Sequence, residues 1–188
     1  MSNPLRILCV CTGNICRSPA IEIMLRDGLE EGFEVFSRGT RALVGNPVDP
    51  TMAMLLADDG HDPSSFVAAR LNPRLDVTGT DLVLTATRDH RSLVVERAPA
   101  AWKKTFTLLE FARLVARNPD HPTGATAPER MRELVSMVGD RRGHGAGEDD
   151  DVVDPYRLGP EVFQASHAQI RSGVDAILAA LSPTPRQG

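Results

Sequence analysis

The chain has 188 residues, of which 41% are hydrophobic and 24% are charged, and this size and composition fit one globular domain with a full apolar core. It shows neither the basic segment and apolar core of a signal peptide nor the roughly 20 apolar residues of a membrane span, so we expect a cytoplasmic protein with no membrane partner. The net charge of −4 with dispersed basic residues excludes a nucleic-acid-binding surface. The five histidines lack the spacing of metal ligands. The three cysteines all lie between Cys9 and Cys16, which excludes a disulfide framework.

Hydrophobic patterning predicts strands that alternate with helices along most of the chain. Leu5 to Val10 form an apolar run typical of a buried strand, and Ser18 with Pro19 begins a helix that we expect to end at Gly32. The pattern then predicts a strand at Phe33–Phe36, a helix from Pro50 that Gly60 closes, a strand at Asp81–Ala86, a helix at Arg88–Arg97, a strand at Thr105–Leu108, a helix at Glu110–Arg117 and a last helix at Pro160–Leu181. This alternation indicates an α/β fold, a doubly wound parallel sheet of four strands with helices on both faces.

Residues 118–153 interrupt the alternation. A capping box from Thr126 to Glu129 begins an amphipathic helix, and the glycine- and charge-rich stretch at 139–151 predicts a mobile loop whose acidic residues face solvent. We therefore expect a single domain over residues 1–188 with a helical and flexible insertion at about 118–153. The insertion is either a surface element packed by its one helix, or a lid or partner-docking element next to the segment that contains Asp154.

The eight residues that follow the first strand have the pattern of a phosphate-binding loop. Gly13 and Asn14 can adopt unusual backbone angles, which lets successive N–H groups turn inward, and the following helix adds its positive end. Arg17 offers a planar fork of donors to two phosphate oxygens, and we expect the Cys11 sulfur, favoured as a thiolate by these groups and by Ser18, to attack the phosphorus. The phosphate loop, as we call it, consists of the nucleophile, the arginine and the loop residues Thr12, Gly13, Asn14, Ile15, Cys16 and Ser18.

The alternative is that Cys11 is only a small buried residue at the end of a strand, which is the commoner role of a lone cysteine. That alternative leaves unexplained why the glycine, arginine, serine and proline all stand where an anion-binding loop needs them.

The motif VCTGNICRSP at Val10 to Pro19 resembles the N-terminal signature of the low-molecular-weight protein tyrosine phosphatases, with its CX5R spacing. Further similar stretches follow in the family's order: SRGT at Ser37–Thr40, NPVDP at Asn46–Pro50, DLVLTATRDHR at Asp81–Arg91, FTLLEFARL at Phe106–Leu114 and VDPYRLG at Val153–Gly159. The resemblance implies that Cys11 is the nucleophile, Arg17 binds the phosphate, Ser18 and Asn14 support the loop, and Asp154 is the general acid. We expect no cofactor, and the scattered histidines predict no metal site.

Asp154 stands in a stretch that suits a proton donor. Pro155 stiffens the turn, and Tyr156 can lie against a planar substrate. A carboxylic acid facing the phosphate loop can protonate the leaving oxygen and then act as a base on the hydrolytic water. Asp151, in the neighbouring acidic run, is the reserve candidate.

Cys16 has two interpretations. It can be a small apolar filler, or its sulfur can come within disulfide range of Cys11; the resemblance supports the second, because family members with paired loop cysteines are reversibly oxidised. Cys9 points to the opposite side of the strand from its neighbours and is expected in the core.

Related families use this scaffold for phosphotyrosine hydrolysis, phosphoarginine hydrolysis and arsenate reduction. The reductases need further cysteines downstream, and the sequence has none after Cys16. The arginine phosphatases carry threonine where this chain has Ile15, whose apolar side chain suits an aromatic ring better than a guanidinium. The sequence also departs from many family members, with no aromatic residue in the variable loop at Arg41–Gly45 and with Phe66 near a position where some have histidine.

The preferred interpretation is therefore an enzyme that hydrolyses phosphotyrosine in a protein substrate and releases inorganic phosphate. The alternatives are a phosphoarginine phosphatase and a non-catalytic module that binds phosphate or phosphotyrosine. A binding module gains nothing from the reactive thiol of Cys11 or from the carboxyl group of Asp154.

Overall fold

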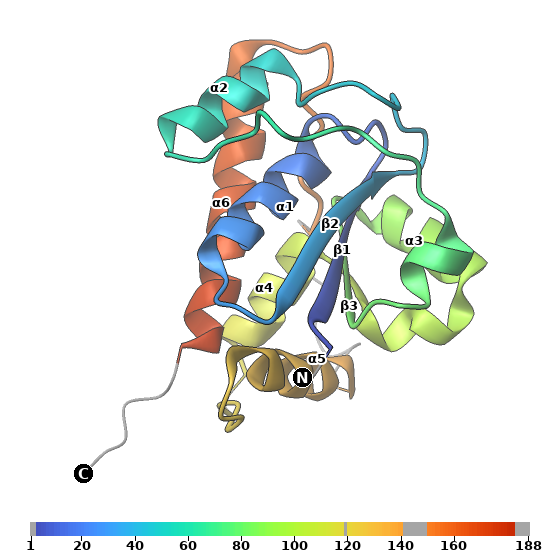
Figure 1. The fold of residues 1–188 in the computed structure, drawn as a ribbon, viewed down its shortest axis with the longest axis vertical. Helices are drawn as coiled ribbons and strands as arrows, with labels where there is room; N and C mark the ends of the chain where they lie inside the picture. The colour runs from blue at the N-terminus through green and yellow to red at the C-terminus, as the bar shows by residue number, and fades with distance from the viewer. Residues whose placement is uncertain (1–2, 119, 141–149, 183–188) are drawn as a thin grey trace.

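The computed structural model describes residues 3–118, 120–140 and 150–182, and these form a doubly wound α/β fold around a parallel sheet (Figure 1). The sheet has four strands in the order β2-β1-β3-β4, so the fold class predicted from the sequence is confirmed. The strands are β1 (Leu5–Cys11), β2 (Phe33–Gly39), β3 (Leu82–Thr85) and β4 (Thr105–Thr107). β1 lies between β2 and β3 and is almost wholly buried, which explains its continuous apolar sequence.

Six α-helices and two shorter helical turns connect the described strands. In chain order they are α1 (Arg17–Gly28), α2 (Pro50–Asp58), the π-helical turn η1 (Pro73–Val77), α3 (Arg88–Arg97), the 3-10 turn η2 (Pro99–Lys104), α4 (Leu108–Ala116), α5 (Ala127–Asp140) and α6 (Pro160–Leu181). The bounds of α3 and α6 are those predicted from the sequence. The two helical turns were not predicted; each is short and begins at a proline.

Several predicted boundaries differ from the structure by one to four residues, and three of the differences have a clear local cause. α1 ends at Gly28 because Leu29 is already extended, and Gly32, with a φ of +97°, instead turns the chain into β2. β2 continues past the predicted end at Phe36 because it pairs with β1 along the full length of that strand. β4 ends at Thr107, whose side chain caps α4 in a capping box with Glu110.

Two apolar cores cover the faces of the sheet. The larger core joins the sheet to α1, α4 and α6, which lie together on one face (Figure 1). The smaller core joins the other face to α3 and the two helical turns. No helix among the described residues is both long and apolar enough to cross a membrane.

Helix α5 of the predicted insertion lies under the sheet, at the amino-terminal ends of the strands (Figure 1). Its Arg132 pairs with Asp81 just before β3, and Pro128 lies against Gly32 just before β2. Met131, Leu134 and Val138 belong to the larger core. The helix thus packs as a surface element at the end of the sheet opposite the phosphate loop, so α5 itself does not form a lid over that loop. Residues 141–149, where we predict a mobile loop, lie outside the described residues.

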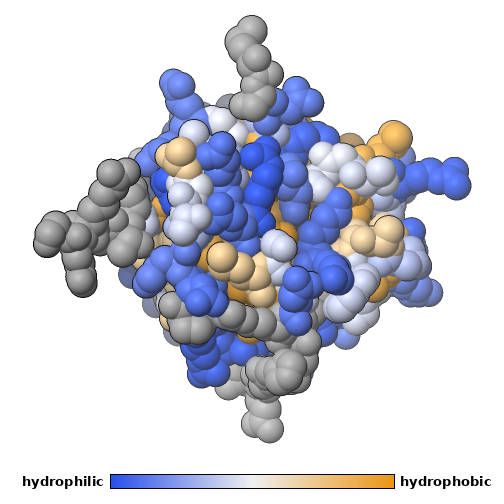
Figure 2. Space-filling model, turned by 90° about the horizontal axis from the view of Figure 1, so that it is seen from below, coloured by the Kyte–Doolittle hydropathy of each residue, from blue (hydrophilic) through white to orange (hydrophobic). Residues whose placement is uncertain are grey.

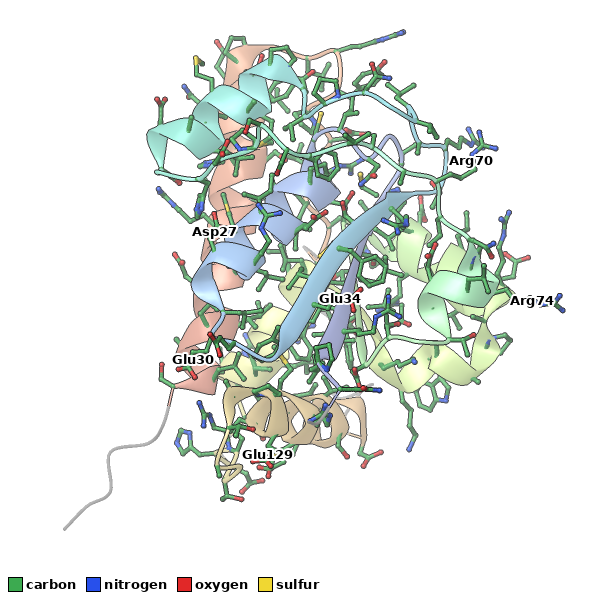
Figure 3. All side chains as sticks on the ribbon, viewed as in Figure 1. Asp27, Glu30, Glu34, Arg70, Arg74 and Glu129 are labelled. Carbon is green, nitrogen blue, oxygen red and sulfur yellow. The ribbon has the colours of Figure 1, made fainter. Side chains whose placement is uncertain are left out.

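Charged side chains spread over the outside of the molecule. Figure 2 shows the end that carries α5, where hydrophilic residues cover most of the visible surface. Figure 3 shows Glu34 on β2 and Glu129 on α5, and the first of these pairs with Arg6 of the neighbouring strand at 3.0 Å.

Gly39, the last residue of β2, lies directly against the phosphate loop. A Cβ atom here would lie 2.7 Å from the Thr12 carbonyl oxygen and 2.8 Å from the Ala42 Cβ, both closer than such atoms pack. The backbone of the loop can therefore hold its position only while residue 39 has no side chain.

We expect Gly39→Ala to lower the free energy of unfolding by about 1–3 kcal/mol, since overpacking forces the backbone to shift, and to weaken the binding of inorganic phosphate. Gly79→Ala is the matched control, because its Cβ would come closer than 3 Å only to the Arg6 guanidinium, the far end of a long side chain that can shift more easily than backbone. Urea unfolding and phosphate titration measure both effects. Equal results for the two variants would contradict the packing argument.

Candidate active site

The phosphate loop follows β1 at the carboxyl end of the sheet, where parallel α/β proteins bind their ligands. Cys11 is the last residue of β1, and Arg17 is the first residue of α1. The loop carbonyls turn outward and accept hydrogen bonds from the segment after β2: Arg41 N–H donates to Thr12 at 2.9 Å, and Asp49 N–H donates to Ile15 at 2.8 Å. With its carbonyls facing this segment, the loop can present its N–H groups to an anion.

Asn14 fixes the loop from behind. Its φ of +56° lies in the left-handed region, which asparagine tolerates better than most residues. The buried side chain donates to the hydroxyls of Ser18 at 2.9 Å and Ser37 at 2.7 Å, and it accepts from Ala69 N–H at 2.8 Å. The expected supporting role of Asn14 therefore has a geometric basis.

The sulfur of Cys11 accepts hydrogen bonds at the base of the loop. The backbone N–H of Asn14 lies 3.3 Å from Sγ, and the Ser18 hydroxyl lies 2.9 Å from it. Because the Ser18 oxygen already accepts a hydrogen bond from Asn14, its own proton is available for the sulfur. Two donors directed at one sulfur favour its thiolate form, the nucleophilic form of cysteine.

Glu22 is the last residue of a buried hydrogen-bond chain that runs from Asn14 through Ser37, and this role was not predicted. The Ser37 hydroxyl donates to its carboxylate at 2.7 Å. Burial raises the pKa of Glu22, and the Ser37 hydrogen bond acts in the opposite direction. The sequence feature that could have indicated this role is an acidic residue on an otherwise apolar face of the helix, four residues after Ser18.

His90 supports the other side of the loop and was also missed. Its Nε2 lies 2.8 Å from the Thr12 hydroxyl, and its Nδ1 lies 2.7 Å from that of Thr87. Burial and the nearby charge of Arg17 lower the pKa of His90 to about 4, so the ring is neutral at pH 7. A neutral ring donates through one nitrogen and accepts through the other, which suits two hydroxyl partners. The sequence feature that could have indicated this role is the position of His90 just after a strand, because that strand ends at the same edge of the sheet as the phosphate loop.

Arg17 and Asp154 meet at the mouth of the loop. The buried Arg17 donates from Nη2 to the Asp154 carboxylate at 2.7 Å and from Nη1 to the Val152 carbonyl at 3.3 Å. Both side chains line one cavity, whose walls are Cys11, Thr12, Gly13, Ile15, Cys16, Arg17, Arg41, Leu43, Asp154 and Tyr156. A thiol, a guanidinium and a carboxyl group thus surround one space, which is the set of groups that transfer of a phosphoryl group to sulfur needs.

The family model of the low molecular weight phosphotyrosine protein phosphatases matches residues 6–123 of the chain. The chain belongs to this family. It is therefore an enzyme, a phosphatase, and its phosphate loop has the CX5R spacing. Asp154 lies beyond the matched residues.

Curated relatives and solved structures cover nearly the whole chain. The probable low molecular weight protein-tyrosine-phosphatase AmsI of Erwinia amylovora is 35% identical over 94% of this chain and 96% of its own length. A protein-arginine-phosphatase of Geobacillus stearothermophilus is 29% identical over 93% and 94%. The solved structure of the YwlE arginine phosphatase from the same organism matches with a TM-score of 0.70 and 27% identity, over 94% of this chain and 92% of that one. The AmsI crystal structure matches in fold with a TM-score of 0.71 and 24% identity, over 97% and 96%.

The structure separates the predicted site residues into two groups. Ile15 and Tyr156 line the cavity, whereas the side chains of Asn14 and Ser18 are buried and do not line it. Of the carboxylates in the described part of the chain, Asp154 is the one that lines this cavity. The described residues hold no group of three or more His, Cys, Asp or Glu side chains suited to a metal ion.

The interpretation of the acidic run as solvent-facing is wrong for Asp150, which is buried. Asp151, the reserve acid, is partly exposed and pairs with Arg88 outside the cavity. Glu148 and Asp149 lie outside the described residues. Arg41 and Leu43 in the variable loop, given no role from the sequence, also line the cavity.

The three cysteines are free. Cys9 lies in the larger core, as predicted, and burial raises the pKa of its thiol. Burial also raises the pKa of Cys16, to about 12, so this residue is a thiol at neutral pH. A disulfide between Cys16 and Cys11 remains a prediction.

Asp154 accepts a hydrogen bond from Nη2 of Arg17, a donor that we expect a bound phosphate to use, and a carboxylate at this place repels an anion. We expect Asp154→Asn to bind inorganic phosphate about two- to fivefold more tightly, the size of effect expected for one partly exposed ion pair. Asp140→Asn, which loses an exposed pair with Lys103, is the control and should not change the affinity. Isothermal titration at pH 7 measures both; weaker binding by the Asp154→Asn variant would contradict the argument.

Proposed function

We propose that this enzyme is a protein tyrosine phosphatase that works through a cysteinyl-phosphate intermediate, with Cys11 as nucleophile, Arg17 as the phosphate ligand and Asp154 as general acid. The observation that supports it best is the Cys11 sulfur with two hydrogen-bond donors, in a cavity shared with the guanidinium and the carboxyl group. The substrate is a phosphoprotein, the products are the dephosphorylated protein and inorganic phosphate, and no cofactor takes part.

The reaction has two steps. The Cys11 thiolate attacks phosphorus, the bond from phosphorus to the tyrosine oxygen breaks, and the Asp154 carboxyl group gives its proton to that oxygen. Water then attacks the phosphorus of the cysteinyl-phosphate, the Asp154 carboxylate takes a proton from the water, and the thiolate leaves. In both steps Arg17 and the loop N–H groups stabilise the charge on the phosphoryl oxygens.

The walls of the cavity favour an aromatic phosphate ester. Ile15, Leu43 and Tyr156 place apolar or aromatic surface around the phosphate loop, and a phenyl ring can pack against these side chains. A phosphoarginine guanidinium needs hydrogen-bond acceptors instead, and Ile15 offers none. The relatives include both tyrosine and arginine phosphatases, so phosphoarginine hydrolysis is the second candidate.

The same proposal extends to organisation and location. We place the enzyme in the cytoplasm, as a single phosphatase domain over residues 1–188 whose insertion at about 118–153 contributes α5 to the far end of the sheet. This packing supports a single domain, since α5 contributes Met131 and Leu134 to the larger core, which also contains Cys16.

We expect Cys11→Ser to lose hydrolysis of p-nitrophenyl phosphate to below detection, because a serine hydroxyl is not ionised at pH 7, while inorganic phosphate still binds to the intact loop. Arg17→Ala is the comparison and should lose both. Steady-state assays and phosphate titration give the two readouts. A wild-type enzyme without turnover would support the non-catalytic binding module, and full turnover by the Cys11→Ser variant would overturn the covalent mechanism.

Ile15 should select between the two substrate classes. We expect wild type to prefer a phosphotyrosine peptide over a matched phosphoarginine peptide in kcat/KM, and Ile15→Thr to narrow this preference by roughly tenfold, since a hydroxyl can now accept a guanidinium proton. Ile15→Val is the control, because valine has the shape of threonine without the hydroxyl. A wild-type preference for phosphoarginine, or equal effects of threonine and valine, would contradict the role of Ile15.

A further inference from the structure

The contact between Arg17 and Asp154 cannot hold the general acid in place during the reaction. Arg17 directs Nη2 at the Asp154 carboxylate and Nη1 at the Val152 carbonyl. A bound phosphoryl group takes the donors of the same guanidinium. The acid loop, defined here as residues 150–154, therefore needs other anchors once substrate is bound.

Asp150 is the strongest of these anchors. Its side chain is only 8% exposed and accepts two hydrogen bonds from the Arg113 guanidinium, from Nε at 3.2 Å and from Nη2 at 2.9 Å. The pair joins the start of the acid loop to α4, a helix packed in the larger core. The same hydrogen bond raises the pKa of Arg113. Two parallel bonds fix the orientation of the carboxylate as well as its distance.

The next three residues of the loop are held to three other elements. Asp151 accepts from the backbone N–H of Arg88, at the start of α3, at 2.7 Å. Val152 N–H donates to the Ala86 carbonyl just after β3 at 2.9 Å, and Val153 N–H donates to Gln169 of α6 at 2.9 Å. Asp154 is the first residue beyond this series, and its half-exposed side chain points into the cavity.

We propose that Asp150, through its ion pair with Arg113, is a positioning residue that keeps Asp154 over the phosphate loop when Arg17 turns to the substrate. The inference rests on the proposed function, because it assumes that Asp154 is the general acid. A buried ion pair is a poor source of stability, since desolvation offsets its attraction, but it strongly penalises any arrangement that separates the partners. That property suits an anchor that must keep one geometry.

Leaving-group dependence distinguishes positioning of an acid from general damage. Phenyl phosphate needs a proton on its leaving oxygen, whereas 2,4-dinitrophenyl phosphate hardly does. We expect Asp150→Asn to lower kcat/KM for phenyl phosphate by about 10- to 100-fold, a part of the 10²- to 10⁴-fold that a positioned acid contributes. For 2,4-dinitrophenyl phosphate we expect less than about a threefold change in kcat/KM, because this ratio reports the first step and not the hydrolysis of the cysteinyl-phosphate that both substrates share. The affinity for inorganic phosphate should not change.

A double-mutant cycle with Asp154→Asn completes the test. If Asp150 acts through Asp154, adding Asp150→Asn to the Asp154→Asn variant should lower the rate with phenyl phosphate little further. Asp140→Asn, an exposed pair at the far end of the sheet, should change neither substrate's kcat/KM. Arg113→Lys, which keeps the charge but loses the two parallel bonds, gives the same readout if Asp150→Asn does not fold.

The outcomes separate the inference from the proposed function. Equal losses with both substrates, or an additive loss in the double variant, overturn the positioning role. If Asp154→Asn itself shows no leaving-group dependence, the assignment of the acid is overturned instead. A selective and non-additive loss supports both.

Discussion

The left-handed backbone of Asn14 is the constraint on which the active site depends. Its side chain ties the phosphate loop to Ser18, to Ser37 on β2 and to the Ala69 backbone, so three separate segments hold one residue in an uncommon conformation. Because the residue is held there, the loop turns back on itself, the Asn14 N–H reaches the Cys11 sulfur, and the Ser18 proton is directed to the same atom. Conformational strain at one position is thus converted into a fixed set of donors around the nucleophile.

Anion binding in a protein of net charge −4 depends on local geometry rather than on overall charge. Arg17 is buried with its head at the cavity, and the neutral ring of His90 supports Thr12 without adding a second buried cation beside it. The acidic side chains near the site are engaged with arginines on α3 and α4. Their charges are therefore neutralised close to the cavity, which limits their repulsion of a phosphate dianion.

The fold and the phosphate loop could be predicted from the sequence because each produces a local sequence pattern. The phosphate loop is contiguous, and glycine, asparagine and arginine each have a distinct backbone or side-chain property that identifies it. Asp154 was recognised from its own short motif. Asp150 and Glu22 were not recognised, because an acidic residue becomes a buried anchor only through a partner distant in the chain, and composition cannot name that partner. The ends of α1, β2 and β4 were missed for a related reason, since pairing and capping decided them rather than hydrophobicity.

The distance along the chain between the two halves of the site has a consequence for folding. Cys11 and Arg17 come from the first βα unit, whereas the contact from Arg17 to Val152 spans 135 residues. Contacts of such long sequence separation form late, because the intervening chain must be ordered first. During synthesis the phosphate loop can therefore form while the acid loop is still inside the ribosome, and such an intermediate would hold phosphate without being able to protonate a leaving group. On the proposed mechanism, hydrolysis therefore requires both halves of the site, and activity reports that the acid loop has packed against the first βα unit.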